Sequence, residues 1–305
     1  MNRFPLARDL VLVGGGHTHI LFLKKFAMNP IEGVRITLVS PRGSATYSGM
    51  IPGYIAGNQK LGLYFEKALH EWIAQEPKLA LIAHNLIVRS KTNTLGEFDL
   101  IVRNKKWIEH WEIAVKFFLG ICNRKNVGHW IGPNPRDTLA RKLDSLQNRQ
   151  IRLGENPDAK RILQQRGIEI DRRRIIFKGR LFHPYKVFKM SRFEVPEDIN
   201  PLHQKGWWLR WEELDHHEEL KNSCFKLLKK EEWLAPFKFT DREELISFAE
   251  LKNRCSHAFT EHTAIINKDG AELSRGFVVS EDWEAQAASI CPEIAADAVY
   301  SRDLG

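Results

Sequence analysis

One stretch of the chain constrains the fold more than any other: Leu95–Gly120, which reads LGEFDLIVRNKKWIEHWEIAVKFFLG. Its two halves alternate, and a period of two is expected of a β-strand with one buried face. The apolar positions on one face are Phe98, Leu100, Val102, Ile113, Val115 and Phe117. The positions on the other face are Glu97, Asp99, Arg103, Glu112, Ala114 and Lys116. A turn signal, Asn104-Lys105-Lys106, separates the halves, so the sequence predicts a β-hairpin.

The register of this hairpin would bring two acidic side chains together. With the turn at Asn104–Trp107, Arg103 pairs with Ile108 and Asp99 lies opposite Glu112. Directly opposite side chains are about 5 Å apart, and like charges at that distance repel. A shared divalent cation would remove the repulsion, because hard cations bind carboxylate oxygens.

Two acids and a lysine on one face of a hairpin are typical of sites that cleave phosphodiesters. Asp99 and Glu112 would hold Mg²⁺, which activates water, and Lys116 on the same face would stabilise the developing charge. The alternative is a surface hairpin with a polar face, in which the two acids are solvated or paired with Arg103. Spacing alone leaves both interpretations open.

Six short segments carry a resemblance to a known family. They are Gly96-Glu97-Phe98-Asp99, His110-Trp111-Glu112-Ile113-Ala114-Val115-Lys116-Phe117, Trp130-Ile131-Gly132-Pro133-Asn134, Gly179-Arg180-Leu181-Phe182, Gly206-Trp207-Trp208 and Arg275-Gly276-Phe277-Val278-Val279. These segments resemble an uncharacterised bacterial family, the domain-of-unknown-function family 1853, over roughly residues 58–285. That family looks like a distant branch of the PD-(D/E)XK nuclease-like superfamily. The resemblance implies an α/β (mixed α+β) fold with a restriction-endonuclease-like core, in which helices flank a central mixed sheet.

The resemblance also implies a catalytic set. Its members would be Glu66, Asp99, Glu112 and Lys116. Glu66 lies in a helix that the apolar spacing predicts at Leu61–Gln75, where the superfamily often directs a glutamate towards the metal. The alternative for Glu66 is a solvated helix residue paired with Lys67 or His70.

The sequence departs from the superfamily pattern at Ala114, where an acid two residues before the lysine is expected. Glu112 lies four residues before Lys116, about 13 Å away along a strand that rises ~3.3 Å per residue. Either the acid has moved along the strand, with Glu97 filling the gap, or the site is inactive. The alternative function is therefore a catalytically inactive module that binds nucleic acid or protein on the same fold.

Other segments show the periodicity of helices or strands. The predicted helices are Asp137–Gln150, Asn156–Arg166 and Glu243–Cys255, and the predicted strands are Leu79–Val88, Ile168–Phe177, Thr263–Asn267 and Gly276–Val279. The first of these helices would flank the candidate site, with Lys142 and Gln150 in a position to touch phosphates. The alternative is an exposed, solvated helix face.

The N-terminal segment carries a glycine-rich turn. Two strand-like segments, Leu10–Val13 and Val34–Val39, enclose Gly14, Gly15, Gly16 and a predicted helix, Ile20–Met28. This truncated, Rossmann-like βαβ order can place a pyrophosphate at a helix N-terminus.

Residues 11–57 as a whole resemble the FAD-binding start of the NADH-dehydrogenase-like flavoprotein that is associated with selenide, water dikinase. The resemblance stops near Gly57, before the rest of a flavin domain, so FAD is not an expected cofactor. A fragment of a FAD-dependent pyridine nucleotide oxidoreductase remains a second alternative, and a tight glycine turn without a ligand is the interpretation we prefer.

Composition bounds the partners and the compartment. A net charge of +8 over 305 residues favours an anionic partner such as nucleic acid, although a basic solvated surface explains it too. No apolar run approaches the ~20 residues that cross a bilayer, so no membrane association is expected. Four scattered cysteines without a CxxC motif fit a reducing cytoplasm. The predicted domains are a Rossmann-like fragment at 1–57, a nuclease-like core at 58–190, the C-terminal part of the same family domain at 191–290 and a tail at 291–305.

Overall fold

The computed structural model describes residues 8–13, 26, 34–39, 61–91, 93–121, 124–235, 245–254, 260–267 and 269–290. Contacts divide the chain into two units, Met1–Gly57 and Asn58–Gly305.

The first unit contains a parallel strand pair, β1 (Arg8–Val13) and β2 (Val34–Val39), aligned along their whole length. Both predicted N-terminal strands are therefore confirmed. The glycines at 14–16 lie outside the described residues, as does the predicted helix Ile20–Met28 apart from Phe26. The Rossmann-like connection and its nucleotide thus stay predictions.

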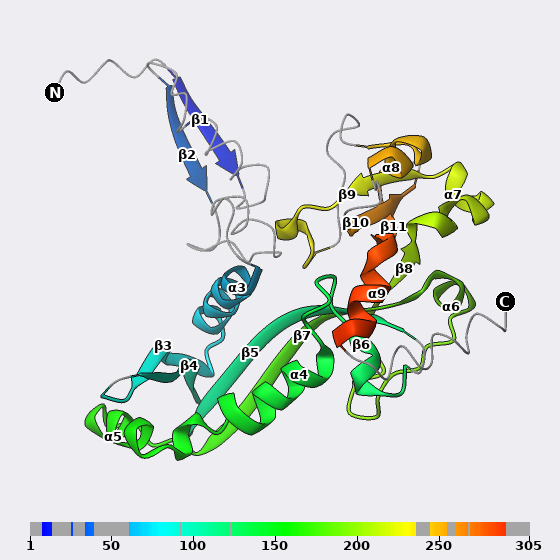
Figure 1. Ribbon diagram of the computed structural model, residues 1–305. Helices are drawn as coiled ribbons and strands as arrows, with labels where there is room; N and C mark the ends of the chain where they lie inside the picture. The colour runs from blue at the N-terminus through cyan, green and yellow to red at the C-terminus, as the bar shows by residue number, and fades with distance from the viewer. Residues whose placement is uncertain are drawn as a thin grey trace. The chain divides into compact units, whose positions relative to one another are not determined.

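The second unit is built on a mixed sheet of nine strands in the order β3-β4-β5-β7-β8-β11-β10-β9, with β6 pairing with β5 (Figure 1). The strands are β3 (Leu79–Arg89), β4 (Thr94–Asn104), β5 (Trp107–Gly120), β6 (Trp130–Ile131), β7 (Arg172–Pro184), β8 (Gln204–Arg210), β9 (Cys224–Leu227), β10 (Glu261–Ile266) and β11 (Glu272–Val279). Strands β10 and β11, which correspond to the predicted strands Thr263–Asn267 and Gly276–Val279, pair in antiparallel orientation. Parallel pairing of β7 with β8 carries one sheet across the boundary predicted at residue 190.

Helices lie on both faces of this sheet. They are α3 (Leu61–Gln75), α4 (Leu139–Asp144), α5 (Pro157–Gln165), α6 (Tyr185–Met190), α7 (Glu218–Lys221), α8 (Phe248–Arg254) and α9 (Glu281–Ile290), with short helical turns η1 (Val127–His129), η2 (Ser145–Gln150), η3 (Leu153–Glu155), η4 (Trp211–His216) and η5 (Lys230–Glu232). Helix α3 has the predicted bounds, and its Ile73 packs on Leu100 and Trp111. On the opposite face, Leu139 of α4 packs on Phe118. None of the helices within the described residues is both long and apolar enough to cross a membrane.

The predicted hairpin is present, and its register is confirmed. Arg103 pairs with Ile108, and the pairing of β4 with β5 continues as far as Leu100 and Trp111. The apolar alternation of β4 is interrupted, however. Phe98 packs in the cluster that contains α5, whereas Leu100 packs against α3 on the other face, so the prediction that these two share a face was wrong.

The prediction of a single buried face on β5 was also wrong. Glu112 is fully buried, and Ala114 and Val115 on alternate faces are each only 8% exposed. The reason is that β5 is an inner strand between β4 and β7, with α3 covering one face and α4 the other. The acid at position 112 therefore lies in the protein interior.

A close approach of β5 and β7 requires glycine at position 179. Gly179 has φ +140°, and a Cβ built there would lie 1.7 Å from the carbonyl oxygen of Lys116. We expect Gly179→Ala to reduce the free energy of unfolding by about 3 kcal/mol or more, which lowers Tm by roughly 6–12 °C. Gly62 in α3 has open space around it, so Gly62→Ala is the control and should be neutral or slightly stabilising. Equal Tm values for Gly179→Ala, Gly62→Ala and the parent protein would contradict the close approach of the two strands.

Candidate functional site

The candidate site begins where β4 and β5 separate. Regular pairing ends at Leu100 and Trp111, and the next amide of β5 that faces β4 belongs to Ile113. That amide donates a hydrogen bond to Oδ2 of Asp99, 2.9 Å away. A side-chain carboxylate thus satisfies a strand amide that has no ladder partner, and buried amides require such a partner. The aspartate is thereby fixed beside β5.

Glu112 lies in the interior next to this aspartate. Its side chain is 0% exposed, and its Oε1 lies 2.8 Å from Nε2 of His110, two residues earlier on the same strand face. Burial lowers the pKa of His110 to about 4, so the ring is neutral near pH 7 and can donate from Nε2. The second oxygen, Oε2, is buried and has no hydrogen bond of regular geometry among the described residues, while Asp99 lies close enough to lower the pKa of Glu112 through hydrogen bonding.

The two carboxyl groups perturb each other. Burial, reinforced by the charge of Glu112, raises the pKa of Asp99 to about 7. Burial likewise raises the pKa of Glu112 to about 7, although Asp99 and the positive charge of Lys142 act in the opposite direction. Two acids coupled in this way retain a proton between them near neutral pH. The two acids that the hairpin register places opposite each other therefore interact in the structure, with a shared proton in place of two full negative charges.

The cation that faces the acid pair is Lys142 of α4. Burial and the charge of Lys116 lower its pKa, and Asp99 and Glu112 raise it. Its Nζ donates to Oε1 of Gln150, 3.2 Å away. This contact spans eight residues because α4 continues into a π-helical turn, η2. Helical turns of the π type are rare in proteins overall, and those that do occur are often found at functional sites.

Lys116 pairs with an acid outside the predicted catalytic set. Its Nζ forms a 2.5 Å ion pair with Oδ2 of Asp137, and both side chains are about one-third exposed, at 35% and 37%. Asp137 precedes Thr138, the N-cap of α4, whose side chain accepts from the Arg141 amide. Lys116 therefore borders the site from the open side, with its charge already neutralised in part.

Glu66 approaches the site from α3. Its Oε2 accepts a hydrogen bond of 3.4 Å from the side chain of Asn85, a residue in left-handed conformation with φ 46°. Burial raises the pKa of Glu66, and the nearby charges of Asp99 and Glu97 contribute to the increase. The charge of Asp99 thus acts on Glu66, and that of Glu112 acts on Asp99, while the charge of Glu97 raises the pKa of all three acids.

Two members of the surroundings were missed in the sequence. His110 could have been found, because a residue two positions before Glu112 shares its strand face. Asp137 gave no such signal, since its contact with Lys116 depends on the loop before α4. Within the parts of the chain that are described, no three or more His, Cys, Asp or Glu side chains converge as a ready-made metal-ligand set.

Comparison with known families gives one match. A family model described as Domain of unknown function (DUF1853) matches residues 47–279. The chain belongs to this family. The match in this DUF1853 protein begins inside the segment that resembles a flavoprotein and includes every residue of the candidate site. No curated protein and no solved structure matches the chain.

The raised pKa values make a prediction about stability. An acid whose folded-state pKa exceeds its unfolded value binds more protons when folded, so stability falls as pH rises through that window. For Asp99 and Glu112 the window runs from about pH 4 to about 7. Asp99→Asn removes one charge and keeps the acceptor for the Ile113 amide. We expect its Tm at pH 8, without divalent metal, to exceed the parent's by about 2–4 °C, and the difference to shrink towards pH 5.

The comparison of variant with parent isolates the acid pair, because all other titrating groups are common to both proteins. Asp282→Asn on the exposed surface of α9 is the matched control and should follow the parent at every pH. Equal pH dependence of the parent and Asp99→Asn would show that these carboxyl groups do not interact.

Proposed function

We propose that the protein is a Mg²⁺-dependent enzyme that hydrolyses phosphodiester bonds in nucleic acid. The observation that carries the proposal is the buried acid pair, Asp99 and Glu112, with one carboxylate oxygen that lacks a hydrogen-bond donor among the described residues. Keeping two carboxylates ionised in the interior costs several kcal/mol, and a bound cation would reduce that cost.

This donor set fits Mg²⁺. The ion takes oxygen ligands and is usually bound through one or two carboxylates, with water and substrate phosphates completing the coordination. Asp99 and Glu112 would hold the ion. No third ligand side chain converges on them among the described residues, which is compatible with coordination by two carboxylates, water and substrate. When bound, the ion supplies Lewis acidity to a phosphoryl oxygen and lowers the pKa of a bound water.

The remaining residues have separate roles in the proposal. His110 fixes the orientation of Glu112 through the 2.8 Å contact and is a positioning residue. Lys142 would stabilise negative charge on the phosphate, with Gln150 fixing the direction of its amine. Lys116, on the exposed side, would bind a phosphate of the nucleic-acid backbone after its ion pair with Asp137 breaks.

The proposal predicts which side chains abolish cleavage. We expect Asp99→Asn and Glu112→Gln to eliminate Mg²⁺-dependent cleavage of DNA or RNA oligonucleotides, and Lys142→Ala to reduce kcat by about 100-fold. Product formation on denaturing gels, with Mg²⁺ or with EDTA, measures this. Glu169→Gln, an exposed acid, is the control and should match the parent.

Cleavage that persists in EDTA, or in the two acid variants, would contradict the proposal. So would a lack of cleavage on every single-stranded and duplex substrate, together with no Mg²⁺ binding by calorimetry. Mg²⁺ should also raise Tm at pH 8 in the parent and not in Asp99→Asn, because a ligand that binds only the folded state stabilises it.

A second candidate function, an inactive nucleic-acid-binding module, is favoured by one specific contact. Ala114 replaces the acid of the superfamily pattern, and Lys116 is engaged by Asp137. For such a module we expect Lys116→Ala to change binding of a labelled oligonucleotide less than threefold. Affinity should still fall steeply with salt, since phosphate contacts release counterions. Binding without cleavage by the parent supports this candidate, and cleavage by the parent excludes it.

A further inference from the structure

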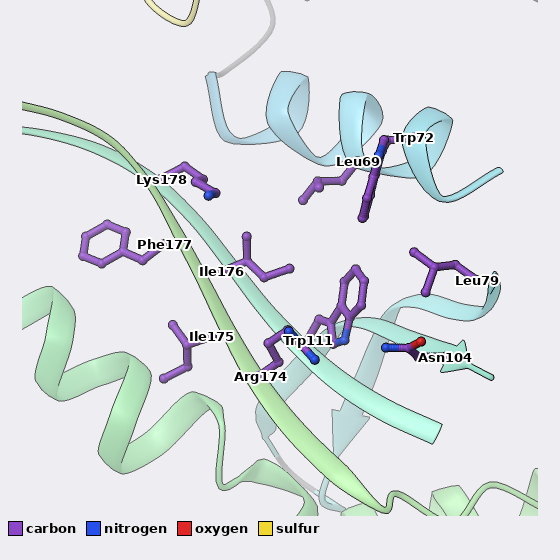
Figure 2. A pocket seen from close by; sticks show the side chains of 10 residues that line it. All are labelled: Leu69, Trp72, Leu79, Asn104, Trp111, Arg174, Ile175, Ile176, Phe177 and Lys178. Carbon is purple, nitrogen blue, oxygen red and sulfur yellow. The ribbon is translucent and has the colours of Figure 1, made fainter. Parts of the chain in front are cut away.

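A cavity lies between helix α3 and strands β5 and β7. It has a volume of about 570 Å³, which lies within the range of ligand sites. Figure 2 shows Leu69 and Trp72 of α3 directed towards Trp111 of β5 and Ile176 of β7. We call this cavity the Trp72 groove, and its lining is Leu69, Trp72, Leu79, Asn104, Trp111, Arg174, Ile175, Ile176, Phe177 and Lys178.

The two indoles of this groove form a wall of aromatic surface. Their ring centroids are 6.4 Å apart, with the planes inclined by 30°. Trp111 is 3% exposed, and its Nε1 donates to Oε2 of Glu109 at 2.7 Å, so its position is fixed. Trp72 is 50% exposed, which leaves much of a large apolar surface in contact with water. An exposed indole beside a fixed one is suited to stacking on a flat aromatic ligand.

The charge of the groove indicates which class of flat aromatic ligand it would bind. Its lining contains two cations, Arg174 and Lys178, and no carboxylate. Arg174 lies 5.8 Å from the Trp111 ring and pairs with Glu109, which is buried behind it. Lys178 forms no salt bridge with any described residue and is exposed. Aromatic faces flanked by cations are the pattern that binds the bases and phosphates of single-stranded nucleic acid.

The unpaired part of β7 lies between this groove and a cavity that Lys116 lines. Strand β8 pairs with β7 only from Arg180 onward, so the segment 172–179 has an open edge within the described part of the sheet. On the far side of that edge lies a second cavity of about 330 Å³, which Lys116 lines. Phe177 and Lys178 border both cavities. A flexible polyanion can therefore follow the edge from one face of the sheet to the other.

We propose that the Trp72 groove binds single-stranded nucleic acid, with a base stacked on Trp72 and phosphates held by Arg174 and Lys178. The bases of a duplex are stacked on each other and present only their edges, so they cannot use an aromatic wall in this way. The inference names the substrate class of the candidate site and in that respect rests on the proposed function. The binding itself requires neither metal nor cleavage.

The test measures binding of the full chain to a fluorescein-labelled 12-nucleotide single strand, and to the duplex of the same sequence, by anisotropy in EDTA. We expect Trp72→Ala to weaken single-strand binding about tenfold, and Trp72→Phe, which keeps an aromatic face, to stay within threefold of the parent. Duplex binding should change little. Leu202→Ala is the control, because Leu202 is 86% exposed and lies outside the groove.

A second variant tests the cations. Lys178→Ala should reduce the dependence of log affinity on log salt by about 0.7, the contribution of one phosphate contact on a single strand. Lys160→Ala on the exposed face of α5 is its control and should leave the slope unchanged.

The outcomes separate this inference from the proposed function. If Trp72→Ala and Trp72→Phe both bind single strands as the parent does, or if the parent shows no preference for single strands, the groove assignment is overturned. Self-association of the parent that is lost in Trp72→Ala, seen by light scattering, would assign the groove to a second copy of the chain and overturn it as well. Failure of nuclease activity alone leaves the binding result standing, since Asp99→Asn should bind the single strand normally in EDTA.

Discussion

Two carboxyl groups held together in the interior determine what the surrounding structure must provide. Removing one ion from water costs several kcal/mol, and two like charges at one place cost more. Part of this cost is offset locally: the Ile113 amide donates to Asp99, the ring of His110 contacts Glu112, and Lys142 supplies a positive charge. Oε2 of Glu112 has no hydrogen bond of regular geometry among the described residues, so the rest of the domain must offset the remaining cost.

The geometry of the site comes from departures from regular structure. Pairing of β4 with β5 ends at Leu100, while β4 continues against β3, so a gap opens in the sheet beside Asp99. Across the same region, Asn85 in β3 is left-handed and η2 is a π-helical turn. Each departure costs free energy on its own and persists only where the surrounding packing determines it. Their concentration around the acids is what one expects of a site selected for chemistry instead of stability.

How much of this could be predicted depends on the range of each interaction. The hairpin register follows from a turn and a period of two, both local, and Arg103 does pair with Ile108. The burial of Glu112 could not be predicted, because α4 covers that face and lies more than twenty residues later in the chain. The ion pair between Lys116 and Asp137 could not be predicted for the same reason, because it depends on the loop that leads into α4. Periodicity also failed at Phe98, where the strand changes face beside the gap.

The open edge of β7 connects the stability of the fold with its proposed partner. An unpaired strand edge exposes amides and carbonyls that other strands can bind, and proteins often protect such edges with charged side chains. Here Arg172, Arg174 and Lys178 are exposed on the unpaired segment, with Arg172 also stacked 4.2 Å from the Trp107 ring. The same cations that repel a further strand attract phosphates. The proposed single-stranded polyanion would use these cations without adding a strand to the edge, and the edge borders the cavity that Lys116 lines.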